Sequence, residues 1–206
     1  MRSFVGITDF DWFMTLSRRS GHPRRGDILP GSPHVETGAP PVLEDLLTQD
    51  LALVVCGSAA GRRSAELKQY YAGPGNKFWR TLAQVGLTPR QLAPSEYELL
   101  LTFGIGLTDV VKGQSGSDRE LDFSGTHPEV LRNKMLEHRP RYMCFNGKRA
   151  AQEFLGRRRV SFGIQPESIA TTGLFIAPST SGAANASWDL SVWKQLADLV
   201  RACPVP

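Results

Sequence analysis

The chain has 206 residues, 41% of them hydrophobic, and a formal net charge of +4 at pH 7. This composition allows one α/β domain with a full core, and no run reaches the ~18 apolar residues that a membrane span requires. Acids at Asp9 and Asp11 argue against a secretion signal, so we expect a cytoplasmic protein without a membrane partner.

The first 41 residues differ in character from the rest. Residues 1–16 predict a short strand, SFVGIT, and a helix, DFDWFMTL, with Asp9 as its N-cap. Residues 17–41 cluster Pro, Gly and Arg without apolar periodicity, which is typical of a linker or long loop. We therefore divide the chain into an N-terminal extension and loop, 1–41, and one catalytic-sized domain, 42–206.

Helix and strand signals alternate from Val42 onward. Ser95 is expected to cap one helix, and Thr126 with Glu129 forms a capping box for another. The expected helices are 42–50, 76–86, 95–104, 127–139, 148–156 and 187–202, and the expected strands are 51–57, 141–147 and a final region at 168–179. This alternation predicts a three-layer α/β/α fold with a mostly parallel central sheet.

Two small-residue turns follow buried strands, in LALVVCGSAAG (51–61) and LFIAPSTSGAANASW (174–188). Such turns let the backbone approach a ligand closely, and ligands of open α/β sheets bind at the carboxyl ends of the strands. We therefore expect the two strand ends to form one pocket.

The cysteine and histidine residues show no pattern typical of a metal site or of a catalytic nucleophile. Three cysteines are too few for a four-thiolate cluster, and we interpret them as buried or terminal thiols: Cys56, Cys144 and Cys203. The histidines fall in loops or at helix ends, and no metal-ligand spacing is visible: His22, His34, His127 and His138. We expect neither a metal nor a cofactor.

The chain resembles the uracil-DNA glycosylase superfamily, particularly its mismatch-specific uracil/thymine branch and its hypoxanthine branch. The resemblance runs from Val42 to Val200 and rests on motifs in matching order: GSAAG (57–61), YYAGPGNKFW (70–79), GLTDVV (106–111), FNGK (145–148), FGIQP (162–166) and PSTSGAANA (178–186). It implies the fold predicted above and an enzyme that acts on DNA.

Two positions depart from the pattern of the family. The mismatch branch positions its attacking water with an asparagine where this chain has Ala59. Other uracil enzymes of the superfamily use a histidine where this chain has Ala177. The resemblance therefore implies that another residue performs the catalysis.

Three residues are candidates for that role or for contact with the base. Asp109, at the position of a pocket asparagine in the thymine branch, could stabilise the sugar cation, activate water or accept from uracil N3–H. Asn76 matches an asparagine of the hypoxanthine branch and is the second catalytic candidate. Asn146, in FNGK, is a candidate for substrate binding. The alternatives are that Asp109 braces a turn, that Asn76 caps a helix and that Asn146 forms a plain turn.

A flipped base is usually stacked on an aromatic ring and read along its edge. By resemblance Tyr71 is the stacking ring, and Phe78 is either a pocket wall or a core residue. The backbone of Gly57, Ser58 and Ala59 suits a base oxygen, because its N–H groups need no side chain.

Phosphate contacts are expected from the final motif and from cations beside the pocket. Ser179, Thr180 and Ser181 offer hydroxyl and N–H groups, or else form only a capped loop. Arg62, Arg63 and Lys148 could bind phosphates or be solvated. Ala183 stands where the thymine branch has an intercalating arginine, so we expect little dependence on the opposite base and activity on single strands.

The prediction is a monofunctional glycosylase that excises uracil from single- or double-stranded DNA and initiates base excision repair, acting as a monomer. Hypoxanthine, or another deaminated base, is the alternative substrate within this class. A catalytically silent lesion-binding protein and an unrelated nucleotide-processing enzyme are the alternatives outside it.

Overall fold

The computed structural model describes residues 40–202. The chain divides into two units, Met1–Thr37 and Gly38–Pro206, and the described residues belong to the second. The strand and helix predicted for residues 1–16 lie outside the described residues, as do Cys203 and nearly all of the loop at 17–41. Between residues 40 and 202, none of the helices combines the length and apolar character that crossing a membrane requires.

A five-stranded sheet forms the centre of the domain, in the order β2-β1-β3-β5-β4. Four strands run parallel and β4 pairs antiparallel with β5. The strands are β1 (Leu53–Gly57), β2 (Ile105–Asp109), β3 (Tyr142–Asn146), β4 (Gly163–Ile169) and β5 (Thr172–Ala177). The mostly parallel sheet is confirmed, and the final strand region is a hairpin of two strands.

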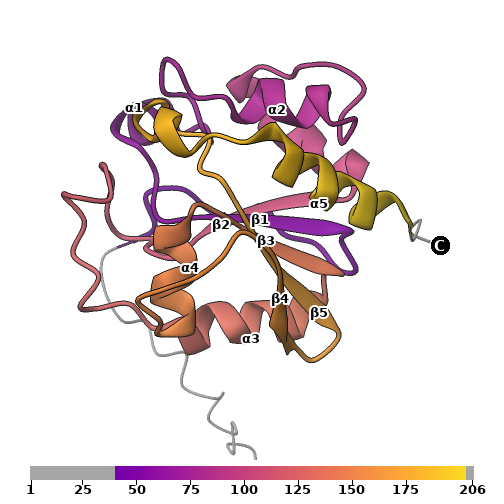
Figure 1. The fold of residues 1–206 in the computed structure, drawn as a ribbon. Coiled ribbons are helices and arrows are strands. Elements are labelled where there is room, and N and C mark those ends of the chain that lie inside the picture. Colours follow the sequence, from indigo (N-terminus) through magenta and orange to yellow (C-terminus); the bar gives the residue numbers. More distant parts are fainter. Residues whose placement is uncertain (1–39, 203–206) are drawn as a thin grey trace, which may run out of the picture. The chain divides into compact units, whose positions relative to one another are not determined.

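Helices cover both faces of this sheet, so the three-layer prediction is confirmed (Figure 1). One layer holds α2 (Phe78–Gln84), the 3₁₀ helix η1 (Pro94–Phe103) and α5 (Leu190–Ala202). The other holds α3 (Pro128–His138) and α4 (Lys148–Leu155). Two short elements lie beside the ends of strands, α1 (Arg62–Leu67) and η2 (Gly182–Ser187).

Each layer has its own apolar core, because residues alternate between the two faces of a strand. Phe78 and Trp193 are fully buried on the α2 and α5 side, and Met135 lies in the core on the α3 and α4 side. The thiols of Cys56 and Cys144 are free and buried, as predicted.

The helix predicted at 42–50 is wrong. Leu46 instead forms an antiparallel bridge with Leu107 in β2, with both N···O distances at 2.9 Å. Leu43 and Leu46 are buried by this arrangement. The apolar spacing fits a helix, but pairing with the exposed edge of β2 satisfies the backbone and buries the same side chains.

Two predicted helix caps are also wrong. The helix after Thr126 begins at Pro128, because a residue before proline avoids the helical region, and Thr126 Oγ1 finds no hydrogen-bond partner among the described residues. Pro94 likewise opens η1 ahead of Ser95, and the Glu96 carboxylate accepts from Ala93 N at 2.8 Å.

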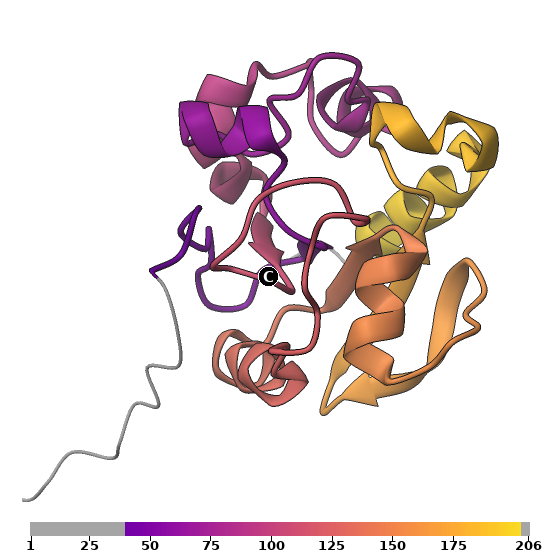
Figure 2. The ribbon, with the colours of Figure 1, turned by 90° about the vertical axis from the view of Figure 1, so that its left-hand side faces the viewer.

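The carboxyl ends of the parallel strands meet at one edge of the sheet, where Gly57 is in register with Asp109 and Asn146 with Ala177. Figure 2 shows the long segment between β2 and α3 crossing in front of the domain, between the upper helices and α3 with α4. This edge brings the predicted site residues into one region.

Candidate active site

Asp109 ends β2 and its carboxylate fills a space that exists because position 57 is glycine. A Cβ on Gly57 would lie 2.5 Å from Asp109 Oδ1 and 3.4 Å from the Tyr71 hydroxyl. Only a residue without a side chain allows this approach. Gly57, the first residue of GSAAG, therefore allows the Asp109 carboxylate to lie against the end of β1.

The Asp109 side chain is buried, and no hydrogen bond from residues 40–202 stabilises its charge. Burial raises the pKa of Asp109 to about 6, with Asp45 adding to the rise and Lys112 opposing it. The alternative of a turn-bracing aspartate requires hydrogen bonds that the described residues do not supply. A buried carboxyl with a raised pKa is a candidate for proton transfer or charge stabilisation.

Tyr71 lies beside this carboxylate in a left-handed backbone conformation, with φ of 53°. Its hydroxyl is buried and finds no hydrogen-bond partner among residues 40–202. Burial and the Asp109 charge raise the pKa of Tyr71 far above its usual value, which the nearby Asn146 amide partly offsets. Burying a hydroxyl without a hydrogen bond lowers the stability of the folded protein. The Tyr71 hydroxyl is therefore a candidate for a hydrogen bond to a ligand.

Phe78 lies beneath Tyr71, with the two rings stacked at 4.0 Å between centroids. Phe78 is fully buried, so it supports the Tyr71 ring from the core and does not form an exposed wall. The two rings together give the strand end a rigid aromatic side.

Asn146 ends β3 and is tied to the final motif by two hydrogen bonds. Its Nδ2 donates to Thr180 Oγ1 and its Oδ1 accepts from Thr180 N, both at 2.9 Å. Thr180 is fully buried, and its hydroxyl and its N–H are both bonded to Asn146, so neither group is exposed to a phosphate in this structure. Its hydroxyl instead holds the loop after β5, which leaves Ser179 and Ser181 as the candidates for phosphate.

Asn76 precedes Lys77, the N-cap residue of α2, and its Oδ1 accepts at 3.0 Å from the N–H of Phe78, the first residue of the helix. The amide oxygen of Asn76 therefore stabilises the start of the helix, which agrees with the structural alternative to a catalytic role. The neighbouring Lys77 N donates to Thr180 O at 2.8 Å, and Lys77 Nζ pairs with Asn185 Oδ1. The segment that contains Asn76 is thereby joined to the final motif.

Five predicted phosphate contacts remain: Arg62, Arg63, Lys148 and Ser181 are exposed, and Ser179 is half-buried. Arg62 pairs with Glu120, Arg63 Nη1 lies 2.9 Å from Glu66 Oε2, and Lys148 Nζ lies 4.5 Å from the Phe162 ring centroid. The Ser179 and Ser181 hydroxyls accept from backbone N–H groups within their own loop, at 3.3 Å. Phosphate binding by these five residues stays a prediction.

The two alanines that depart from the family pattern lie at different depths. Ala59 is half-buried after β1, whereas Ala177 is fully buried at the end of β5. Ser58 O accepts from Val111 N at 2.8 Å, which joins the GSAAG turn to the segment after β2. Neither alanine supplies a polar side chain, so the candidate charge at this edge comes from Asp109.

A pair of charged residues near Asp109 was missed by sequence reasoning. Lys112 Nζ lies 2.7 Å from Asp45 Oδ1, with 20% and 17% of the two side chains exposed. The residues are 67 positions apart, and Asp45 was assigned to a helix that does not form. The signal available in the sequence was a lysine three residues after the candidate carboxylate.

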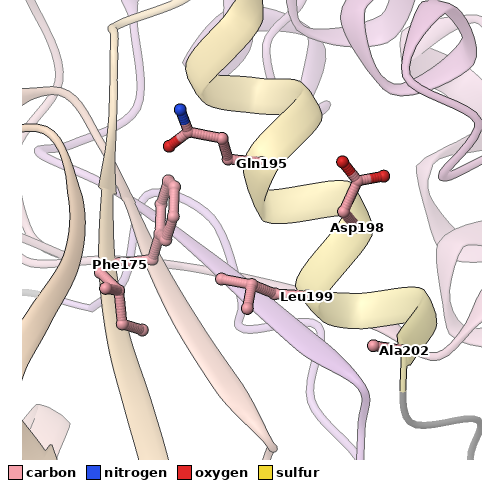
Figure 3. Close-up of a pocket in the computed structure, with 6 residues that line it drawn as sticks. Phe175, Gln195, Asp198, Leu199 and Ala202 are labelled. Carbon is pink, nitrogen blue, oxygen red and sulfur yellow. The ribbon is translucent and has the colours of Figure 1, made fainter.

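Two hollows among the described residues lie away from Asp109, Tyr71 and Asn146. Figure 3 shows the larger, about 470 Å³, between β5 and α5, where Phe175 and Leu199 face each other. The other, about 390 Å³, is lined by Arg149, Arg157 and Arg158 around α4. Neither of these two hollows is lined by Asp109, Tyr71 or Asn146. Residues 40–202 contain no cluster of His, Cys, Asp and Glu suited to a metal ion.

Two comparisons with known proteins show what this chain is similar to. A family model described as the Uracil DNA glycosylase superfamily matches residues 45–199. Among solved structures, the solution structure of a candidate uracil DNA glycosylase from Methanosarcina acetivorans is 23% identical, covers 78% of this chain and 95% of its own, and has a TM-score of 0.48. The family match spans most of the chain and confirms the resemblance, so the chain belongs to the uracil DNA glycosylase superfamily.

Proposed function

We propose that the protein is a monofunctional DNA glycosylase that flips a deaminated base, uracil in the first place, and hydrolyses its N-glycosidic bond. The observation that carries this proposal is the Asp109 carboxylate, buried at the end of β2 without a hydrogen bond from residues 40–202. The reaction leaves an abasic site, the starting point of base excision repair.

Cleavage of an N-glycosidic bond places positive charge on the sugar and negative charge on the base. A nearby carboxylate stabilises the sugar cation or takes a proton from the attacking water, and N–H groups stabilise the base oxygens. Asp109 supplies the first function, and the backbone at Ser58 and Ala59 supplies the second. Tyr71 offers its ring for stacking.

The deciding experiment is a base-release assay on labelled oligonucleotides that carry uracil, hypoxanthine, xanthine or a thymine mismatch, as single and double strands. We expect uracil release, and a loss of at least about 100-fold in Asp109→Asn, because a positioned acid or base contributes that much. Asn76→Ala tests the second candidate in the same assay.

Asp118→Asn is the matched control, because Asp118 is an exposed carboxylate on the segment that follows the same strand. Equal activity of Asp109→Asn and Asp118→Asn would remove Asp109 from the mechanism. Tight binding of uracil-containing DNA without release of any base would replace the enzyme with a lesion-binding protein. Turnover confined to free nucleotides would exclude both.

Hypoxanthine is a second candidate substrate, favoured by the raised pKa of Asp109. An ionised carboxylate cannot donate to the purine O6, but a pKa of about 6 leaves about a tenth of the molecules protonated at pH 7. Uracil release that requires the carboxylate should rise as pH increases through 6, whereas hypoxanthine release that requires the acid should fall. The two pH profiles therefore separate the substrates.

A further inference from the structure

A second group of charged residues consists of Asp45, Lys112 and Lys134. One Asp45 oxygen lies 2.7 Å from Lys112 Nζ and accepts from Thr108 Oγ1 at 2.7 Å, and the other pairs with Lys134 Nζ. Thr108 directly precedes Asp109 in β2. The group is thus attached to the strand that carries the candidate carboxylate.

Lys112 is fixed from several directions. Its Nζ lies 3.2 Å from the Tyr70 hydroxyl, which donates to Glu44 O at 3.0 Å, and its backbone O accepts from Val42 N at 2.7 Å. A lysine held by this many contacts has lost the conformational freedom typical of an exposed lysine. Its charge therefore occupies a defined position after the end of β2.

The charges that act on Asp109 come from the segment before β1 and the segment after β2. Asp45 disfavours ionisation of Asp109, and Lys112 favours it. Lys134 binds the same Asp45 carboxylate but is not among the charges that act on Asp109. The titratable groups around Asp109 are Asp45, Cys56, Tyr70, Tyr71 and Lys112. Lys112 is the one cation among them within the described residues.

We propose that Lys112, held in place by Asp45 and Tyr70, is a positioning residue that keeps the Asp109 carboxylate charged for the glycosylase reaction, an inference that rests on the proposed function. Asp109 has lost its hydration and gains no hydrogen bond from residues 40–202 in return. A fixed cation is then the main factor that favours its ionised form. Asp45 prevents Lys112 from turning into solvent.

The test measures the charge of Asp109 directly and does not require substrate. In protein labelled with ¹³C at the aspartate carboxyl groups, Asp109→Asn identifies the Asp109 resonance, and its titration is followed by NMR. We expect Lys112→Met to raise the titration midpoint by about one unit or more. If the midpoint moves from about 6 to about 7, single-turnover release of uracil should fall by about twofold at pH 7 and by about tenfold at pH 5, and the acidic limb of the pH profile should move by the same amount as the NMR midpoint.

Three further variants separate charge from packing. Lys112→Arg should restore the midpoint and the pH profile, and Lys112→Gln, which keeps a donor for Asp45, should shift both as methionine does. Lys134→Met, the matched control, removes a cation from the same Asp45 carboxylate and should leave the Asp109 midpoint unchanged.

An unchanged midpoint in both Lys112→Met and Lys112→Gln overturns the inference. If the wild type releases uracil and the midpoint does not move, the proposed function stands and the role of Lys112 is wrong. If the midpoint moves but no base is released by the wild type, Lys112 does control the Asp109 charge and the proposed function is wrong.

Discussion

The two halves of the candidate site satisfy their polar groups in opposite ways. At the ends of β3 and β5, the amide of Asn146 and the hydroxyl and N–H of Thr180 are joined to each other by two hydrogen bonds. At the ends of β1 and β2, Asp109 and the Tyr71 hydroxyl are buried without such partners among the described residues. The difference separates a supporting half from a reactive half.

The half of the site around Asp109 is expected to lower the stability of the folded protein. Buried polar groups without partners are costly, and they persist where function requires them. The half around Asn146 and Thr180 holds the final loop in a fixed position, whereas the half around Asp109 keeps a carboxyl in an unfavourable environment. Three substitutions test this division, from the largest expected effect to the smallest.

Asp109→Asn should make the protein more stable at pH 8 by about 3 kcal/mol, because the folded state no longer has to hold a buried charge. The pKa of Asp109 is about 6 in the folded state and about 3.8 otherwise, so the wild type loses stability as pH rises between these values. At pH 4 the carboxyl is mostly protonated and the gain should be small. Urea unfolding at both values measures it.

Asp118→Asn, at an exposed position, should change stability by less than about 0.5 kcal/mol at either pH. If Asp109→Asn lowers the stability at pH 8, the folded protein stabilises the charged carboxylate. The polar groups of both halves of the site would then have stabilising partners.

Asn146→Ala should lower the free energy of unfolding by about 2 kcal/mol, because it removes two hydrogen bonds and leaves buried Thr180 groups without partners. Denaturant unfolding measures the loss, and Asn133→Ala, at an exposed position of α3, is the control with the same change of side chain. A loss no larger than that of the control would show that Asn146 does not support the final loop.

Tyr71→Phe should change stability by less than about 0.5 kcal/mol or increase it, since the removed hydroxyl has no partner within residues 40–202. Tyr70→Phe is the matched comparison, because its hydroxyl donates to Glu44 O and contacts Lys112, and we expect a loss of about 1 kcal/mol. Thermal melts of both variants give the difference. An equal loss in both would mean that the Tyr71 hydroxyl has a partner in solution.

The sequence predicts the layers of this fold well because they depend on local patterns. Buried runs such as Leu53–Gly57 and the amphipathic helix Leu190–Ala202 are read directly from apolar spacing. The segment around Leu46 defeats the same method, since its apolar spacing fits a helix while its hydrogen bonds go to a strand more than 60 residues away. β2 was recognised only as a motif, because it ends in a charged residue.

The site shows the same limit. The position of Asp109 at a strand end follows from its motif, and the hydrogen bond of Asn76 to the start of α2 follows from residue type and place. The pairing of Asn146 with Thr180, and of Lys112 with Asp45, depends on which strands become neighbours, which no local pattern encodes. Such contacts between distant segments decide which polar groups remain available for chemistry.

The missing side chain of Gly57 offers a rule for reading other chains of this fold. A single methyl group at that position would lie 2.5 Å from Asp109 Oδ1, closer than two non-bonded atoms can approach. A carboxylate at the end of β2 can therefore be assigned to the site only in chains whose first strand ends in glycine. Where a larger residue ends that strand, an aspartate aligned with Asp109 would have to turn its carboxylate away from the end of β1.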